Sequence, residues 1–351
     1  MYRLLIRPLL FLLKPEHVHN LIVTLLKAIF RTPIFPSSIF SAIFQYKHKK
    51  LHTKFLGLDF KNPVGLAAGF DKNAEVYNEF SHFGFSFIEI GTVTPRPQPG
   101  NPQPRSFRIP KDKGLINRMG FNNKGVDYTV SQLKKNTPKV IIGGNIGKNT
   151  ATSNENSIND YSEAFNKLYP HVDYLVINLS CPNIKNLNEL QNKDKTIDIV
   201  KILESDRDAF NKRKPILLKI SPDLTTEQLD EAIEIYYQTG IDGIIATNTT
   251  VSRENLITEQ NKIDAIGNGG LSGKPLTKRS TEFIRYISEK SSGNIPIIGV
   301  GGIMTIEDAI EKIRAGATLV QVYTGFIYNG PAFVKKLNKS ILNERLKESG
   351  N

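Results

Sequence analysis

Eight similar units follow one another from residue 62 onward, and this repeat constrains the fold more than any other feature. Each unit is a short apolar or β-branched run that ends in Gly, Asn, Ser or Thr, followed by a longer segment with helical spacing. Strands of this kind alternating with helices predict a parallel sheet, and eight units over about 270 residues predict a closed (β/α)8 TIM barrel. The runs are PVGLAAG (63–69), FSFIEIGT (85–92), KVIIGGNI (139–146), YLVINLS (174–180), PILLKIS (215–221), GIIATNT (243–249), IPIIGVG (295–301) and LVQVYTG (319–325).

An open, doubly wound sheet is the alternative fold. That fold usually carries a G-x-G-x-x-G turn after an early strand, and no such turn occurs here. Two insertions interrupt the repeat, at residues 95–123 after the second run and at residues 181–196 after the fourth. Both follow the carboxyl end of a strand, where barrel enzymes build their active sites. We therefore expect both insertions to border a functional site.

The residues that end the eight runs are mostly neutral and polar. Asparagine and threonine hydrogen-bond a flat, heteroatom-rich ligand without adding charge, and two lysines could stabilise a developing anion. The absence of histidines and of paired carboxylates argues against metal-assisted hydrolysis, Ser/His/Asp acyl transfer and glycoside hydrolysis. The strand-end residues are Gly69 with Asp71 and Lys72, Thr92, Asn145, Asn178, Lys219, Thr247 to Thr249, Gly301 with Gly302, and Tyr323 with Thr324.

The last two strand ends predict a phosphate site. GVGGI and YTG place small residues and backbone amides where barrels commonly hold a phosphate. A phosphate there, amides around a flat ring and a lysine at the fifth strand together suggest flavin mononucleotide, FMN. Lys219 interrupts the buried run PILLKIS, so we expect it beside the N1/O2 edge of the flavin, where it would stabilise the reduced anion.

Cys181 is the only cysteine of the chain and lies just past the end of the fourth run. A lone cysteine is usually a small buried apolar residue. Here, however, it lies in a loop expected to cover the barrel mouth, flanked by Asn178 and Asn183. A thiol with a pKa of about 8.5 can act as a base near neutral pH if its thiolate is favoured. The position favours Cys181 as the base that removes a C–H proton while hydride leaves the neighbouring carbon.

Charge is distributed unevenly along the chain. The net charge is +12, yet residues 1–50 contain eight Lys and Arg residues against Glu16 alone. A basic surplus in a short apolar segment indicates an anionic membrane surface, whereas nucleic-acid binding would need a basic stripe with stacking aromatics. One cysteine excludes an internal disulfide, and zinc-site spacings are absent, so we expect a reducing, cytoplasmic setting and no metal.

The first fifty residues contain amphipathic helices. Apolar residues recur at three- and four-residue steps over 18–29 and again over 39–44, with a proline-marked turn between them. The longest stretch without charge or proline near the start, Leu9 to Leu13, is far shorter than the roughly 20 residues of a spanning helix. A cleaved signal peptide is the alternative, but no small-residue cleavage site follows. These helices could also simply pack on the main domain.

Ten motifs together resemble the dihydroorotate dehydrogenase family from about Leu51 to the C-terminus. The N-terminal extension and TVTPRPQPGNP resemble class 2, the membrane-associated enzymes that pass electrons from FMN to a quinone. The resemblance implies oxidation of dihydroorotate to orotate in pyrimidine biosynthesis. The motifs are AAGFDK, EIGTVTPRPQPGNPQPR, INRMGFNN, GGNIGKN, INLSCPN, KISPD, ATNTT, GGLSGKPL, IIGVGGI and QVYTG.

The resemblance also implies roles for individual residues. Residues 1–50 would form a segment for membrane contact and quinone access, and residues 51–351 the FMN-binding catalytic barrel. The FMN contacts carry over to Ala68, Gly69, Lys72, Thr92, Asn145, Asn178, Lys219, Thr247, Gly273, Gly302, Tyr323 and Thr324. The orotate contacts carry over to Lys72, Asn117, Arg118, Met119, Gly120, Phe121, Asn178, Asn183, Asn248 and Thr249. The polar contacts to quinone carry over to His19, Arg108 and Tyr323.

The position of Cys181 departs from class 2, which usually has serine there, whereas cysteine is typical of the soluble class 1 enzymes. The extension and the proline-rich insertion still favour class 2, at the cytoplasmic face of the cell membrane as a peripheral protein. Two alternatives remain. One is a class 1-like dehydrogenase that uses another electron acceptor. The other is a barrel that has lost catalysis and serves as a membrane-bound scaffold.

Overall fold

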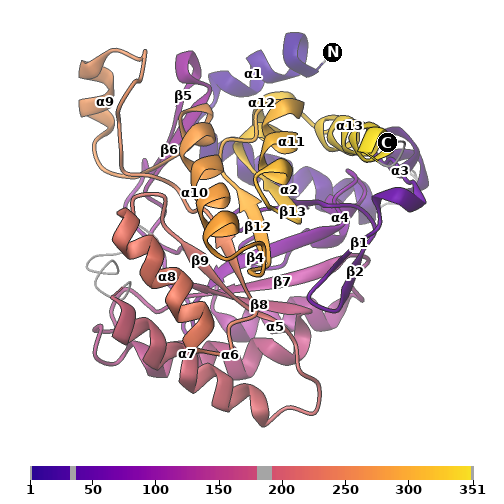
Figure 1. Cartoon of the computed structure of the whole chain (residues 1–351). Coiled ribbons are helices and arrows are strands. Elements are labelled where there is room, and N and C mark those ends of the chain that lie inside the picture. The colour runs from indigo at the N-terminus through magenta and orange to yellow at the C-terminus, as the bar shows by residue number, and fades with distance from the viewer. Residues whose placement is uncertain (1, 32–36, 180–191, 349–351) are drawn as a thin grey trace.

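The computed structural model describes residues 2–31, 37–179 and 192–348. Its centre is a closed barrel of eight parallel strands whose order around the barrel follows the chain (Figure 1). Every predicted run forms one of these strands, which confirms the predicted TIM barrel. The strands are β3 (Val64–Leu66), β4 (Phe87–Val93), β7 (Ile141–Ile146), β8 (Tyr174–Asn178), β9 (Ile216–Ile220), β10 (Gly243–Ala246), β12 (Ile297–Val300) and β13 (Leu319–Val322).

Helices follow the strands and cover the outside of the barrel. Local sequence fixes where two of them begin: Thr225 and Gln228 form a capping box at the start of α8 (Thr226–Gln238), and Thr305 and Asp308 form another at the start of α11 (Ile306–Arg314). The helices are α4 (Tyr77–Ser81), α5 (Val126–Lys135), α6 (Ser157–Leu168), α7 (Lys193–Asp208), α8 (Thr226–Gln238), α9 (Gln260–Ile266), α10 (Thr277–Lys290), α11 (Ile306–Arg314), α12 (Thr324–Asn329) and α13 (Phe333–Glu348).

The inside of the barrel is apolar at the amino ends of the strands. Side chains from several strands, among them Phe87 and Leu217, form a buried cluster there. A two-stranded hairpin of β1 (Thr53–Phe55) and β2 (Leu58–Phe60) adds Phe55 and Phe60 to the same cluster. The rings of Phe60 and Phe87 meet edge to face at 5.2 Å. The hairpin therefore closes this end of the barrel.

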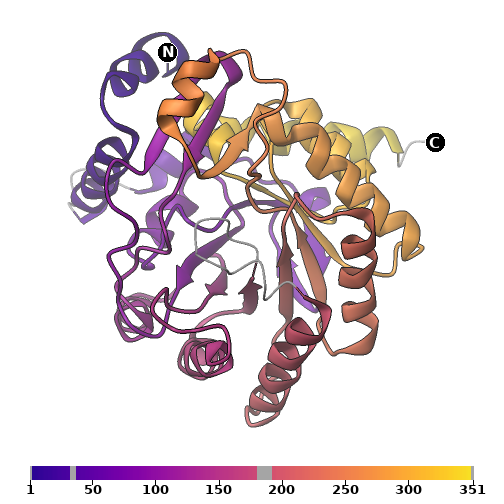
Figure 2. The same cartoon turned by 90° about the vertical axis from the view of Figure 1, so that its left-hand side faces the viewer.

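The first insertion forms part of a small antiparallel sheet. Strands β5 (Ser106–Ile109), β6 (Gly114–Asn117) and β11 (Gly270–Gly273) pair in the order β5-β6-β11. Figure 2 shows the β5–β6 pair beside the N-terminal helices. As predicted, this insertion lies at the carboxyl end of a barrel strand. The second insertion lies largely outside the described residues.

The N-terminal extension is helical. The two predicted helices are present as α2 (Pro15–Arg31) and α3 (Ser37–Phe44). A π-helical turn, Tyr2–Ile6, and α1 (Arg7–Leu12) precede them and were not predicted. Among the described helices, none is by itself long and apolar enough to cross a membrane; one pair, Tyr2–Leu12 with Pro15–Phe30, meets the length and composition criteria only jointly and is bent by 117°.

Two ion pairs hold α2 against the loops of the barrel mouth. Glu16 receives hydrogen bonds from Nε and Nη2 of Arg105, the shorter at 2.7 Å, and Arg105 is only 8% exposed. Lys27 lies 3.0 Å from Glu75. A bidentate arginine–carboxylate pair has a fixed geometry, so it sets the position of α2 on the barrel as well as strengthening the contact.

The predicted division of the chain into two parts at residue 50 stays a prediction.

Candidate active site at the carboxyl ends of the strands

Four predicted strand-end residues form one hydrogen-bonded chain across the barrel mouth. Thr92 Oγ1 donates to Asn145 Oδ1 at 2.6 Å, and Asn178 Nδ2 donates to Thr92 Oγ1 at 2.9 Å. Asn248 Nδ2 donates to Asn178 Oδ1 at 3.3 Å. Thr92, Asn145 and Asn178 are buried, each no more than 6% exposed. The predicted layer of neutral amides and hydroxyls therefore exists.

A buried carboxylate lies below this layer, and the sequence analysis missed it. Glu89 is fully buried on β4 and lies 3.3 Å from Nζ of Lys219. Its other partners are Asn145 Nδ2 at 2.8 Å and Gln321 Nε2 at 2.6 Å. Glu89 interrupts an apolar run just as Lys219 does, so the signal that identified Lys219 was also present for Glu89. Lys219 is confirmed as a buried residue that points into the barrel.

The loop after β3 presents Lys72 to the mouth. Its ammonium donates to the Gly69 carbonyl at 3.0 Å. Desolvation, and next the charge of Arg105, lowers the pKa of Lys72 to about 8. Asp71 fixes the loop by accepting from the backbone N–H groups of Glu75 and Val76, both at 2.8 Å, and burial raises the pKa of Asp71 to about 6.

Glycines allow close approach of backbone segments beside the seventh and eighth strand ends. Gly302 has φ +72°, and a Cβ atom there would lie 2.3 Å from the Thr277 backbone. Gly273 has φ +96°, and its Cβ would lie 2.3 Å from the Lys113 carbonyl. Only glycine fits either position. Thr324, on the same side, contacts the Ser272 hydroxyl at 2.8 Å. Ala68 and Gly69 follow β3, and Thr247 follows β10.

The predicted substrate residues lie in several different parts of the structure. Asn178 and Asn248 belong to the mouth network, whereas Asn117 ends β6 and donates to the Gly270 carbonyl at 3.3 Å. Arg118 stacks on Phe107 and donates to the carbonyls of Ile266 and Asn268, so its guanidinium turns toward α9. The remaining members are placed as follows: Met119, Gly120 and Phe121 form the loop after β6, Thr249 follows Asn248, and Asn183 lies outside the described residues, as does the predicted base, Cys181.

Two of the three predicted quinone contacts meet at one aromatic side chain. The ring of His19 lies 5.4 Å from that of Phe70, and the ring of Tyr323 lies 5.0 Å from it. Desolvation, and next the charge of Lys72, lowers the pKa of His19 to about 4, so its imidazole is neutral at pH 7. Burial raises the pKa of Tyr323 to about 12. Arg108 instead stacks on Phe11 and donates to the Leu13 carbonyl at 2.7 Å.

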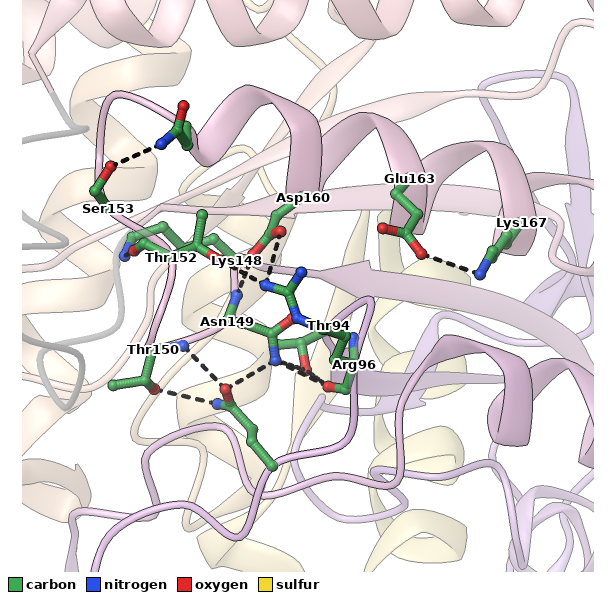
Figure 3. A network of polar contacts seen from close by, with 12 residues as sticks. Thr94, Arg96, Lys148, Asn149, Thr150, Thr152, Ser153, Asp160, Glu163 and Lys167 are labelled. Atoms are coloured by element: carbon green, nitrogen blue, oxygen red, sulfur yellow. Dashed lines mark hydrogen bonds and ion pairs between the residues drawn. The ribbon is translucent and has the colours of Figure 1, made fainter.

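A polar network fastens the first insertion to the loop after β7 (Figure 3). The backbone N–H of Asn149 donates to Asp160 at 2.7 Å, and its side-chain amide donates to Thr94 Oγ1 at 3.1 Å. Arg96 lies 3.3 Å from Asp160 and donates to Thr152 Oγ1 at 2.7 Å. These contacts hold the proline-rich segment beside the mouth.

One groove borders the loop after β12 and the start of α10, where Met304, Thr305 and Thr277 line it. Its volume is about 910 Å³, and it lies where Arg3 and Arg7 of the extension face α10 and α11. Seven of its lining residues are basic and three are acidic: Arg3, Arg7, Lys113, Lys274, Lys278, Arg285 and Arg314 against Glu282, Asp308 and Glu311. Within residues 2–31, 37–179 and 192–348, no group of three or more His, Cys, Asp or Glu side chains could hold a metal ion.

Comparison with known proteins places this chain in a family. Residues 50–346 match the model of the family described as dihydroorotate dehydrogenase. The chain belongs to the dihydroorotate dehydrogenase family. The match covers every barrel strand, so the predicted resemblance is confirmed over the range from which it was drawn. As a member of this family, the chain is an oxidoreductase.

Relatives place the chain in the quinone-dependent, class 2 branch of the family. It is 56% identical over 346 residues to the dihydroorotate dehydrogenase (quinone) of Christiangramia forsetii, covering 99% of this chain and 100% of that protein. It is 44% identical to the enzyme of the same name from Cellvibrio japonicus, covering 94% and 95%. The crystal structure of the Eimeria tenella enzyme in complex with ferulenol superimposes with a TM-score of 0.86 at 37% identity, covering 96% of this chain and 92% of that one.

Proposed function

We propose that this chain oxidises dihydroorotate to orotate, with FMN as its bound redox cofactor and a membrane quinone as electron acceptor, in pyrimidine biosynthesis. The observation that carries the proposal is the amide and hydroxyl network of Thr92, Asn145, Asn178 and Asn248 above the buried ammonium of Lys219. It occurs in a chain of the dihydroorotate dehydrogenase family. Such a surface suits a flat, uncharged ring system that gains negative charge on reduction.

The side chains and glycines at the mouth fit FMN. Lys219 would face the ring edge that becomes anionic, and the amides would hydrogen-bond its heteroatoms. Gly273 and Gly302, where a Cβ would clash, leave backbone free to approach a phosphate at the start of α10. When bound, FMN supplies the hydride acceptor. The chain supplies the remaining groups: Cys181 as the base, and Lys72, Asn117, Asn183 and the other predicted contacts for the substrate.

Orotate should bind more weakly at alkaline pH. Lys72, with a pKa near 8, is largely charged at pH 7 and loses its charge as the pH rises through 8. If its ammonium binds the substrate carboxylate, the dissociation constant of orotate should increase by up to about tenfold per pH unit above 8. Spectral titration with orotate between pH 6 and 10 measures this. Lys72→Arg keeps its charge throughout and should bind orotate without this dependence; the same decline in Lys72→Arg would contradict the assignment.

The quinone would approach through the extension. His19 and Tyr323 on either side of Phe70 support this route, because a neutral imidazole and a protonated phenol can both donate to a quinone carbonyl. Leu4, Leu9 and Leu12 are 80%, 67% and 82% exposed, an apolar surface suited to peripheral contact with lipid. The basic groove beside it suits anionic lipid, and we place the contact at the cytoplasmic side of the cell membrane.

An absorbance spectrum of the purified protein tests the proposal most directly. We expect a yellow protein whose flavin absorbance bleaches when dihydroorotate is added without oxygen and returns when a soluble quinone is added. A colourless preparation would refute the cofactor assignment and favour the scaffold alternative. Bleaching without recovery on quinone would refute the acceptor and favour the class 1-like alternative.

A further inference from the structure

Glu89 is a charged residue in the interior of the barrel, and its carboxylate is fully buried. Three donors from three other strands converge on it: Asn145 from β7, Lys219 from β9 and Gln321 from β13. All three donors are buried. Desolvation, and next the charge of Glu89, raises the pKa of the neighbouring Tyr174 well above its usual value, so that phenol stays neutral. Among these partners in the described interior, Lys219 is the cation, because Asn145 and Gln321 are neutral amides.

Two of these donors are residues that we assign to the cofactor. Asn145 gives its Nδ2 to Glu89, and this fixes its amide so that Oδ1 accepts from Thr92 and Asn178 at the mouth. The ammonium of Lys219 lies 3.3 Å from Glu89 Oε1. One carboxylate therefore sets both the orientation of an amide and the effective charge of a lysine. A buried carboxylate is screened little by solvent, so its charge acts beyond its direct contacts.

We propose that Glu89 is a positioning residue that tunes the reduction potential of the bound flavin through Lys219. The proposal rests on the proposed function, because it needs FMN above Lys219. Lys219 alone would strongly favour the anionic reduced flavin and raise the potential. The Glu89 carboxylate offsets part of that positive charge and lowers the potential, which favours passing electrons on to the quinone. Gln321 and Asn145, by donating to the same carboxylate, moderate its charge.

The decisive variant is Glu89→Gln, which removes the charge but keeps the shape. We expect the protein to stay yellow and its flavin midpoint potential to rise by at least about 30 mV, a tenfold change in equilibrium for a two-electron couple. The potential is measured by anaerobic titration against reference dyes, at the same pH for every variant. Glu89→Asp, which retains the charge, should stay closer to the wild-type potential.

Gln321→Met provides an independent test with the opposite sign. It removes one donor from the carboxylate and leaves the charge of Glu89 more exposed to Lys219, so the potential should fall. If the Glu89→Gln variant does not retain flavin, the Gln321→Met variant still tests the proposal. Asp160→Asn is the matched control. Asp160 is also buried, but its partners are Arg96 and Asn149 in the network of Figure 3, so the flavin midpoint potential of this variant should equal that of the wild type.

The outcomes separate this inference from the proposed function. A colourless wild-type protein overturns both. A yellow wild-type protein whose Glu89→Gln or Gln321→Met variant keeps the wild-type potential overturns the role of Glu89 alone. The same upward shift in Asp160→Asn overturns it too, because any buried carboxylate would then have the effect. Shifts of opposite sign in Glu89→Gln and Gln321→Met, with no shift in the control, support it.

Discussion

Replacing Cys181 with alanine should slow the reduction of the bound flavin by dihydroorotate by a factor of roughly 10²–10⁴, the usual contribution of a positioned general base. The alanine variant should nevertheless remain yellow, because Cys181 is not among the residues assigned to the cofactor. Anaerobic stopped-flow measurement of flavin bleaching checks the rate, and the absorbance ratio at the flavin and protein maxima checks cofactor content.

Cys181→Ser is the matched variant for this test. A hydroxyl ionises at much higher pH than a thiol, whose ordinary pKa is about 8.5, so the serine variant should need higher pH to reach its maximal rate. The wild-type rate should rise with pH through the thiol ionisation, between roughly pH 6 and 9. Wild-type bleaching in Cys181→Ala would make Cys181 a packing residue, and a wild-type profile without an ionisation in that range would exclude the thiol as the base.

Gly302→Ala should abolish stable cofactor retention. The new Cβ would lie 2.3 Å from both Cα and N of Thr277, so either the glycine loop or the start of α10 must move. Forced overpacking of this kind costs about 3 kcal/mol, and if that cost falls on the loop that receives the phosphate, the affinity for FMN falls roughly 100-fold. Fluorescence titration of the apoprotein with FMN measures the dissociation constant.

Gly293 offers a control that separates backbone strain from the clash. Its φ of +74° matches the +72° of Gly302, but nothing lies within 4 Å of the Cβ that an alanine would add. Gly293→Ala should therefore lower the free energy of unfolding by about 1–2 kcal/mol, the cost of a left-handed alanine, while FMN binds as before. Equal loss of FMN in both variants would show that general destabilisation, and not the shape of the phosphate loop, is responsible.

The barrel could be predicted because each of its units carries a local signal. Every strand is a short buried run bounded by turn residues, and the right-handed connections of a parallel barrel then bring all strand ends to one mouth. This is why Thr92, Asn145 and Asn178, far apart in the chain, could be expected in one site. Lys219 was identified because it interrupts the buried run PILLKIS at the end of the fifth strand.

Glu89 carried the same local signal as Lys219, but the pairing of the two residues could not be predicted. Whether Lys219 meets Glu89 or another polar residue depends on the stagger of strands that are not neighbours, and no local pattern encodes that. The same reason applies to Arg118, whose guanidinium turns toward α9 because a segment some 150 residues later passes beside it. The turns at residues 2–12 were missed because helical segments this short depend on tertiary contacts, such as that of the Tyr2 hydroxyl with the Ile327 carbonyl at 2.7 Å.

The hairpin of β1 and β2 determines from which end ligands can enter the barrel. With Phe55 and Phe60 closing one end, every molecule that exchanges with the barrel interior must enter and leave at the opposite rim. The electron donor and the electron acceptor therefore cannot enter the barrel from opposite ends. The two molecules must instead approach the same rim from different directions. Part of this rim lies under α2, where Glu16 forms an ion pair with Arg105. Both half-reactions therefore use the same open end of the barrel.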